Sequence, residues 1–134
     1  MKNKLEKYNC PLGITLGIIG GKYKTIIIWF LYQNKVLRYN ELQKTIKGIT
    51  PKMLISQLRE LEEDGIIERK VYPVVPPKVE YSLTIKGESL IPILLEMRKW
   101  GEKYQTWIFS KAGRFFTSKR RKPFSNIIIK HFWC

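Results

Sequence analysis

Residues 50–65, TPKMLISQLRELEEDG, contain the start, the buried face and the end of one amphipathic helix. The Thr50 hydroxyl can cap the first turn, and Pro51 suits the first helical position, where a backbone N–H has no helical partner. Three leucines then recur at helical spacing and form one apolar stripe: Leu54, Leu58 and Leu61. Gly65 follows the last turn and ends the helix. The stretch therefore predicts a strongly capped helix with one buried face.

A shorter helix is expected directly before this one. Asn40 can cap it, and Leu42 and Ile46 lie four residues apart on one of its faces. Gly48 ends it within the three-residue turn 47–49. Two helices joined by a tight turn that contains glycine form the helix-turn-helix pattern.

Two apolar segments precede this pair of helices. Residues 11–19 fit either a buried helix or a strand, and Gly20-Gly21 marks their end as a helix stop would. Residues 22–32 contain the unbroken apolar run 26–31, whose β-branched members favour a strand. Their length favours a buried helix, and a helix is our prediction.

The segments that follow predict a hairpin and a further helix. Residues 66–72 and 78–83 partly alternate polar and apolar side chains around a proline-containing loop, as the two strands of a hairpin wing do. Thr84 then opens one long amphipathic helix, kinked at Pro92, whose apolar side chains recur every three or four residues. An apolar stripe of this length needs a partner surface.

Charge divides the 134-residue chain, whose length suits a single domain. It has 25 Lys and Arg against 11 Asp and Glu, and this net charge of +14 attracts polyanions, nucleic acid first among them. Half of the surplus lies in residues 110–134, which contain no acid. We therefore expect a folded domain over 1–109 and a basic extension over 110–134. Three interpretations stay open for the extension: extra phosphate contacts, packing of its apolar end on the domain or on a membrane surface, and mobility, which is the default.

The sequence also argues against several classes of protein. No apolar stretch reaches the roughly 18–20 residues of a membrane-spanning helix, and residues 1–10 do not resemble a secretory signal, so we expect an intracellular protein with no membrane partner. A single histidine and two cysteines cannot complete a closed zinc site, so we expect no metal and no cofactor. Because a GxSxG elbow and a phosphate-binding loop are missing from the sequence, we expect no enzyme.

Several short motifs stand in one order across roughly residues 8–105. They are Cys10-Pro11, Ile19-Gly20-Gly21-Lys22, Arg38-Tyr39-Asn40-Glu41-Leu42, Gly48-Ile49-Thr50, residues 58–65 (LRELEEDG), and residues 76–84 (PPKVEYSLT) with Gly87. Together they resemble the HxlR family of bacterial winged helix-turn-helix transcriptional regulators. Tyr23 and Tyr39 stand where that family usually has Trp and Phe, both aromatic exchanges that a core tolerates.

The resemblance implies a mainly α (α+β) fold, a winged helix-turn-helix with a two-stranded β-hairpin wing and N- and C-terminal dimerisation helices. It also implies a homodimer that binds double-stranded DNA at a near-palindromic operator, in the bacterial cytoplasm and associated with the nucleoid. Physical reasoning favours the dimer independently, because the apolar N-terminal segment and the C-terminal stripe exceed what one small core covers. The alternative function is a nonspecific architectural nucleic-acid-binding protein.

The exposed N-terminal turns of the capped helix are the expected DNA contacts, since the start of a recognition helix lies nearest the bases. Lys52 and Ser56 meet this condition, with Gln57 at the edge, and base or phosphate contacts are open for each. Arg59 shares the face but has acidic neighbours, so a surface ion pair is as good an interpretation as a phosphate contact. The remaining candidates are Arg38, Asn40, Thr50, Arg69, Lys70 and Lys78. Strand alternation sends Arg69 and Lys70 to opposite faces, so one of those two is expected to contribute.

Cys10 is the candidate sensor. Some members of the HxlR family, which this sequence resembles, respond to electrophiles or oxidants through a cysteine at this Cys-Pro position, and others use no cysteine. A helix N-terminus near Lys7 would favour the nucleophilic thiolate. A redox sensor and a small apolar residue packed at the dimer interface both stay open, and a small molecule or an oxidant is the expected kind of inducer.

Overall fold

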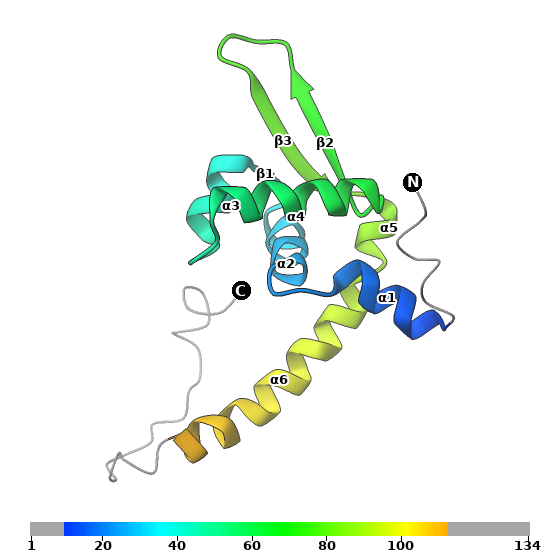
Figure 1. The fold of residues 1–134 in the computed structure, drawn as a ribbon, viewed down its shortest axis with the longest axis vertical. Helices are drawn as coiled ribbons and strands as arrows, with labels where there is room; N and C mark the ends of the chain where they lie inside the picture. Colours follow the sequence, from blue (N-terminus) through cyan, green and yellow to red (C-terminus); the bar gives the residue numbers. More distant parts are fainter. Residues whose placement is uncertain (1–9, 113–134) are drawn as a thin grey trace. The chain divides into compact units, whose positions relative to one another are not determined.

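A computed structural model describes the backbone of residues 10–112 and the side chains of residues 10–105 (Figure 1). Two compact units divide the chain, Met1–Ile91 and Pro92–Cys134. In chain order the elements are α1 (Pro11–Ile19), α2 (Lys24–Asn34), β1 (Val36–Arg38), α3 (Tyr39–Thr45), α4 (Pro51–Glu63), β2 (Ile67–Tyr72), β3 (Lys78–Leu83), α5 (Ile85–Glu88) and α6 (Ile91–Ala112). Most of the expected basic extension, and Lys7, lie outside the described residues. The domain boundary near residue 109 stays a prediction.

Helix α1 is capped at both ends. Cys10 is its N-cap, and the Cys10 Sγ accepts a hydrogen bond of 3.3 Å from the Gly13 N–H, while Pro11 occupies the first helical position. The helix ends where the Gly20 N–H donates to the Leu16 carbonyl over 2.7 Å. The apolar pattern left helix and strand open, and the structure has the helix.

Helix α2 is a buried helix of the first unit, as predicted. Ile27, Ile28 and Leu31 are completely buried, so burial outweighs the strand preference of the β-branched side chains. Among the described residues no single helix combines the length and the apolarity of a membrane span. Only α1 and α2 taken together reach those limits, and they are bent by 75° at their junction.

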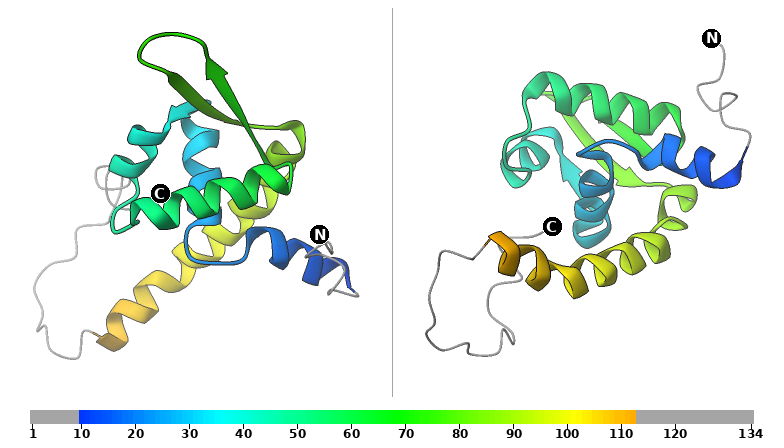
Figure 2. Two further views of the ribbon diagram at one scale, coloured as in Figure 1. Left: turned by 45° about the horizontal axis from the view of Figure 1, so that its top comes forward. Right: turned by 60° about the horizontal axis from the view of Figure 1, so that its bottom comes forward.

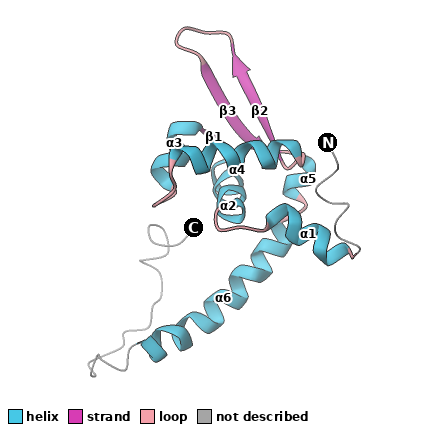
Figure 3. Cartoon of the chain, in the orientation of Figure 1, coloured by secondary structure: helices cyan, strands magenta, loops and turns pink. Residues whose placement is uncertain are grey.

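The sheet has one strand more than the sequence predicts. Its order is β1-β3-β2 and all pairs are antiparallel, so the predicted β2–β3 hairpin is confirmed. Figure 3 shows this hairpin in magenta, projecting beyond the helices of the first unit. β1 has three residues and pairs Leu37 with Tyr81. A strand this short shows no alternation that a sequence pattern could reveal.

The single long helix predicted from Thr84 is wrong, because two helices stand in its place. The Thr84 hydroxyl caps α5 by accepting the Gly87 N–H over 3.0 Å, but α5 ends at Glu88 and α6 begins at Ile91. Pro92 therefore lies in the first turn of α6 and does not kink a helix interior. Proline lacks the N–H that an interior position needs and disfavours helical backbone at the residue before it, so the chain breaks ahead of Pro92.

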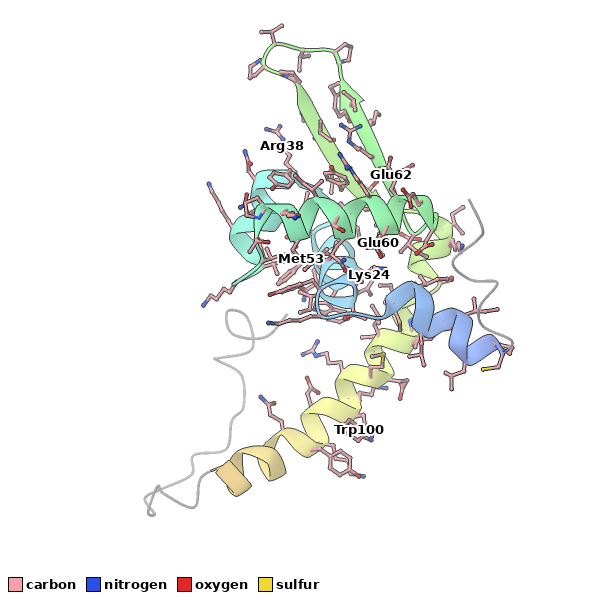
Figure 4. The ribbon with its side chains drawn as sticks, in the orientation of Figure 1. Lys24, Arg38, Met53, Glu60, Glu62 and Trp100 are labelled. Carbon is pink, nitrogen blue, oxygen red and sulfur yellow. The ribbon has the colours of Figure 1, made fainter. Side chains whose placement is uncertain are left out.

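The core of the first unit forms where α4 lies across α2, beside the sheet (Figures 1 and 2). Its most completely buried large side chains are Ile27, Ile28, Leu31, Leu42, Leu54, Leu61, Ile66 and Ile67. One charged group joins the two helices: the Lys24 ammonium, on a side chain only 3% exposed, lies 2.6 Å from the Glu60 carboxylate. In Figure 4 the two side chains point toward one another from α2 and α4. The rotation of α4 about its axis is thus set by its leucines and by this ion pair.

Candidate nucleic-acid interface

Helix α4 starts as predicted and turns its polar face outward. The Thr50 Oγ1 accepts a hydrogen bond of 3.2 Å from the Met53 N–H, and Pro51 is the first helical residue. The leucine stripe is buried, so the opposite face is exposed and carries Lys52, Ser56 and Arg59. Gln57 is half-buried at the edge of this face, as expected. Arg59 forms no ion pair with an acidic side chain among the described residues. The surface ion pair, one of the two interpretations of Arg59, is therefore not formed in this part of the chain.

An open surface hollow of about 650 Å³ lies along this face of α4. The residues that line it are Lys52, Ile55, Ser56, Arg59, Glu60 and Glu63. Lys52 belongs to the first turn of the helix, whereas both glutamates belong to the last turn. The start of a helix also carries the positive end of its dipole. Helix α4 therefore attracts phosphate at its start and repels phosphate at its end.

The start of α3 differs from the prediction. Arg38, not Asn40, is the N-cap, and the Arg38 N–H donates to the Glu41 Oε2 over 2.7 Å. Because this carboxylate reaches back to the N-cap, the first turn does not need the asparagine cap. Asn40 lies within the first turn of α3 with its side chain exposed, and the Arg38 side chain is also exposed.

The hairpin separates its cations between two faces, as strand alternation predicts. Arg69 pairs with Tyr81, on the face that carries this buried tyrosine, whereas Lys70 pairs with Glu80 on the opposite face. That opposite face, called the wing face from here on, carries Arg38, Lys70, Tyr72, Lys78 and Glu80. The structure thus brings together three predicted DNA contacts from three strands: Arg38, Lys70 and Lys78.

Tyr72 and Glu80 organise the cations of the wing face. The ammonium groups of Lys70 and Lys78 lie 5.0 and 4.7 Å from the centre of the Tyr72 ring. Lys78 also lies 2.8 Å from the Glu80 carboxylate. The hydrogen bond from Lys78, a second one from Tyr72 and the positive charges of Lys78 and Arg38 lower the pKa of Glu80, against an opposing effect of burial. Glu80 is therefore charged at neutral pH and partly neutralises Lys78.

Two exposed residues of α4, Ile55 and Met53, have no predicted role, and of the two Ile55 alone lines the surface hollow. Their side chains are 42% and 43% exposed, although both are large and apolar. All the DNA contacts predicted from the sequence are polar or charged side chains. A signal was present in the sequence, because neither residue belongs to the leucine stripe that fixes the buried face.

At the first helix, Cys10 is a free and exposed thiol. Its Sγ faces the start of α1, where it accepts the hydrogen bond from the Gly13 N–H. Leu12 and Leu16 on the same helix are exposed apolar side chains. The other cysteine, Cys134, lies outside the described residues.

The sequence matches the HxlR-like helix-turn-helix family over residues 18–108. A relative in Bacillus subtilis, the HTH-type transcriptional regulator YdeP, itself uncharacterised, is 55% identical over 96 residues, which are 72% of this chain and 74% of YdeP. Relatives of this kind are regulators and not enzymes.

Solved structures agree with the sequence match. The redox regulator HypR in its reduced form superposes with a TM-score of 0.71 and is 48% identical, covering 75% of this chain and 99% of HypR. The reduced form of the transcriptional regulator YodB from B. subtilis gives a TM-score of 0.63 at 36% identity, over 72% of this chain and 95% of YodB. The chain therefore belongs to the HxlR-like helix-turn-helix family of transcriptional regulators, whose members are DNA-binding proteins.

Proposed function

We propose that this protein is a sequence-specific transcriptional regulator that binds a near-palindromic operator as a homodimer, with the start of α4 in the major groove. The observation that carries the proposal is the capped start of α4, which presents Lys52 and Ser56 outward beside the helix dipole. The cations of the wing face support it, because they add a second group of phosphate contacts to the same unit. The proposed DNA contacts are Arg38, Asn40, Thr50, Lys52, Ser56, Gln57, Arg59, Lys70 and Lys78, and Arg69, on the other face of the hairpin, is the alternative to Lys70.

Exposed apolar side chains support the homodimer. On α1, Leu12 and Leu16 are exposed, and on α6 a stripe at helical spacing is exposed: Ile93, Met97, Trp100 and Tyr104. Trp100 alone is 66% exposed. Two-fold pairing is the commonest way to cover such surfaces, and it would present two copies of α4 to two half-sites. Because the partner is chromosomal DNA, we place the regulator in the cytoplasm, at the nucleoid.

The test is a titration of two labelled duplexes, one from the region upstream of the gene and one of random sequence, over a series of salt concentrations. We expect tighter binding to the first and a steep loss with salt, because each neutralised phosphate releases counterions. Lys52→Ala should lower the slope of log K against log salt by about 2, because the homodimer loses one phosphate contact at each of its two half-sites. Lys99→Ala is the matched control, since it removes the same charge from an exposed side chain on α6. Equal affinity for both duplexes would refute the proposal and favour an architectural nucleic-acid-binding protein.

We further propose that Cys10 makes operator binding sensitive to oxidants or electrophiles. The exposed free thiol at the start of α1 supports this, together with the name of the relative HypR, a redox regulator. Diamide should change operator binding of the wild type and leave Cys10→Ser unaffected. Serine is a good N-cap, so this variant keeps the start of α1 intact. An equal response of both proteins would remove Cys10 from the mechanism.

A further inference from the structure

We propose that Ile55 reads thymine in the operator, through contact between its side chain and the 5-methyl group of that base. The inference rests on the proposed function, in which α4 enters the major groove. It assigns a specificity role to an apolar side chain on a face that otherwise offers charged and hydroxyl groups. Three features support it: the position of Ile55 on α4, the charged residues around it, and the single kind of apolar group in the major groove.

Ile55 lies between two cations on the outward side of α4. Lys52, Ile55 and Arg59 stand at i, i+3 and i+7, so they share one stripe of the helix. At a rise of about 1.5 Å per residue, Ile55 is roughly 4.5 Å along the axis from Lys52 and roughly 6 Å from Arg59. All three line the surface hollow, together with the Ser56 hydroxyl. A DNA backbone held by the two cations would bring base edges to the position of Ile55.

The far end of the hollow disfavours phosphate and so favours base edges. Glu60 and Glu63 line it there, and Glu60 is already engaged by Lys24. Carboxylates repel the phosphate backbone but can accept hydrogen bonds from base amino groups. Ile55 lies between the basic start of α4 and this acidic end, where base edges and not the phosphate backbone would face the helix.

In the major groove the apolar group that a base pair presents is the thymine methyl. Every other base edge shows hydrogen-bond donors or acceptors, and an isoleucine placed against one would desolvate it without a partner. Because the Ile55 side chain is 42% exposed in the free protein, burying it against a thymine methyl favours binding, and burying it against another base edge disfavours binding. Ile55 is for this reason a specificity-determining residue and not a general contact.

Met53 is a natural control on the same helix. It is as exposed as Ile55, at 43% against 42%, but it does not line the hollow. Two residues turn the helix by about 200°, so Met53 projects from the other flank of α4 than Ile55. Truncation of Met53 removes a similar apolar side chain from α4 without touching the proposed contact.

The experiment replaces each thymine of the bound operator, one at a time, by deoxyuridine, which lacks the 5-methyl group and keeps every hydrogen-bonding group. We expect wild-type affinity to fall about three- to fivefold at one thymine per half-site, as loss of one buried methyl group should give. Ile55→Ala should bind thymine and deoxyuridine operators equally at that position, Ile55→Val should keep part of the difference, and Met53→Ala should keep all of it.

Two outcomes would overturn the inference. One is a wild-type protein that is insensitive to deoxyuridine at every thymine, and the other is an Ile55→Ala variant that keeps the full penalty. Both are distinct from failure of the proposed function, because preference for the unmodified operator over random DNA is measured first in the same titrations. Ile55 is exposed, so its variants should unfold at the wild-type temperature, which a thermal scan verifies.

Discussion

Replacement of Glu60 on α4 by glutamine should destabilise the protein, because it leaves the buried Lys24 ammonium on α2 without its partner. The Lys24 side chain is 3% exposed, that of Glu60 is 33% exposed, and the two charged groups are 2.6 Å apart. Glu60→Gln keeps the size and a hydrogen-bond acceptor but leaves the Lys24 ammonium buried without an opposite charge. An uncompensated charge of this kind is costly because water cannot reach it.

The magnitude lies between two limits. Loss of one partner from a fully buried pair costs about 3–5 kcal/mol, and an exposed pair is worth about 0–1 kcal/mol. Because Glu60 retains a third of its exposure, we expect about 2–3 kcal/mol for Glu60→Gln. At roughly 4 °C per kcal/mol for a chain of this size, the melting temperature should fall by about 8–12 °C.

The assay is thermal and urea unfolding of wild type, Glu60→Gln, Lys24→Met and the double variant. Lys24→Met removes the buried charge itself and leaves a carboxylate that water can reach, so it should cost less than about 1 kcal/mol. The double variant should match Lys24→Met to within about 0.5 kcal/mol, because the introduced glutamine then faces no charge. If Glu60→Gln and Lys24→Met cost the same small amount, the buried ammonium does not depend on Glu60 and the reasoning fails.

Changes at four further positions test other parts of the fold by urea unfolding. Thr50→Ala should cost about 1 kcal/mol through loss of the N-cap of α4, with Thr50→Ser near wild type. Gly87→Ala should lower the free energy of unfolding by about 2–3 kcal/mol, because the new Cβ would lie 2.1 Å from the Ile66 carbonyl oxygen. At Gly101 a new Cβ meets nothing within 4 Å, so Gly101→Ala should raise the free energy of unfolding by up to about 1 kcal/mol. Equal effects of the two substitutions would contradict the packing of α5. Because the pKa of Glu80 is lowered, the contribution of this carboxylate to folding stability is complete above pH 4.5 and is lost as the pH falls through the lowered pKa. Glu80→Gln should therefore lose less stability in acid than the wild type does. Identical pH profiles of the two proteins would argue against the wing-face hydrogen bonds.

Much of the candidate site could be predicted because its signals are local. Thr50, Pro51 and the leucine spacing determine where α4 begins and which side is buried, whatever the rest of the chain does. Gly65, with a φ of 70°, marks the end of that helix for an equally local reason. The alternation of Arg69 and Lys70 follows from strand geometry alone. Such features depend on neighbours within a few residues, which the sequence states directly.

Other features needed the tertiary structure because their causes are distant along the chain. β1 exists through pairing with β3, far away in sequence, and Arg38 joins the wing face only through that pairing. The buried Lys24 is recognisable only once Glu60 is seen beside it. The exposure of Ile55 likewise depends on what packs against α4 and what does not. Caps and periodicity are local properties, whereas burial is a property of long-range contacts, and this is why the sequence alone predicted helix α4 but not the side chains that surround it.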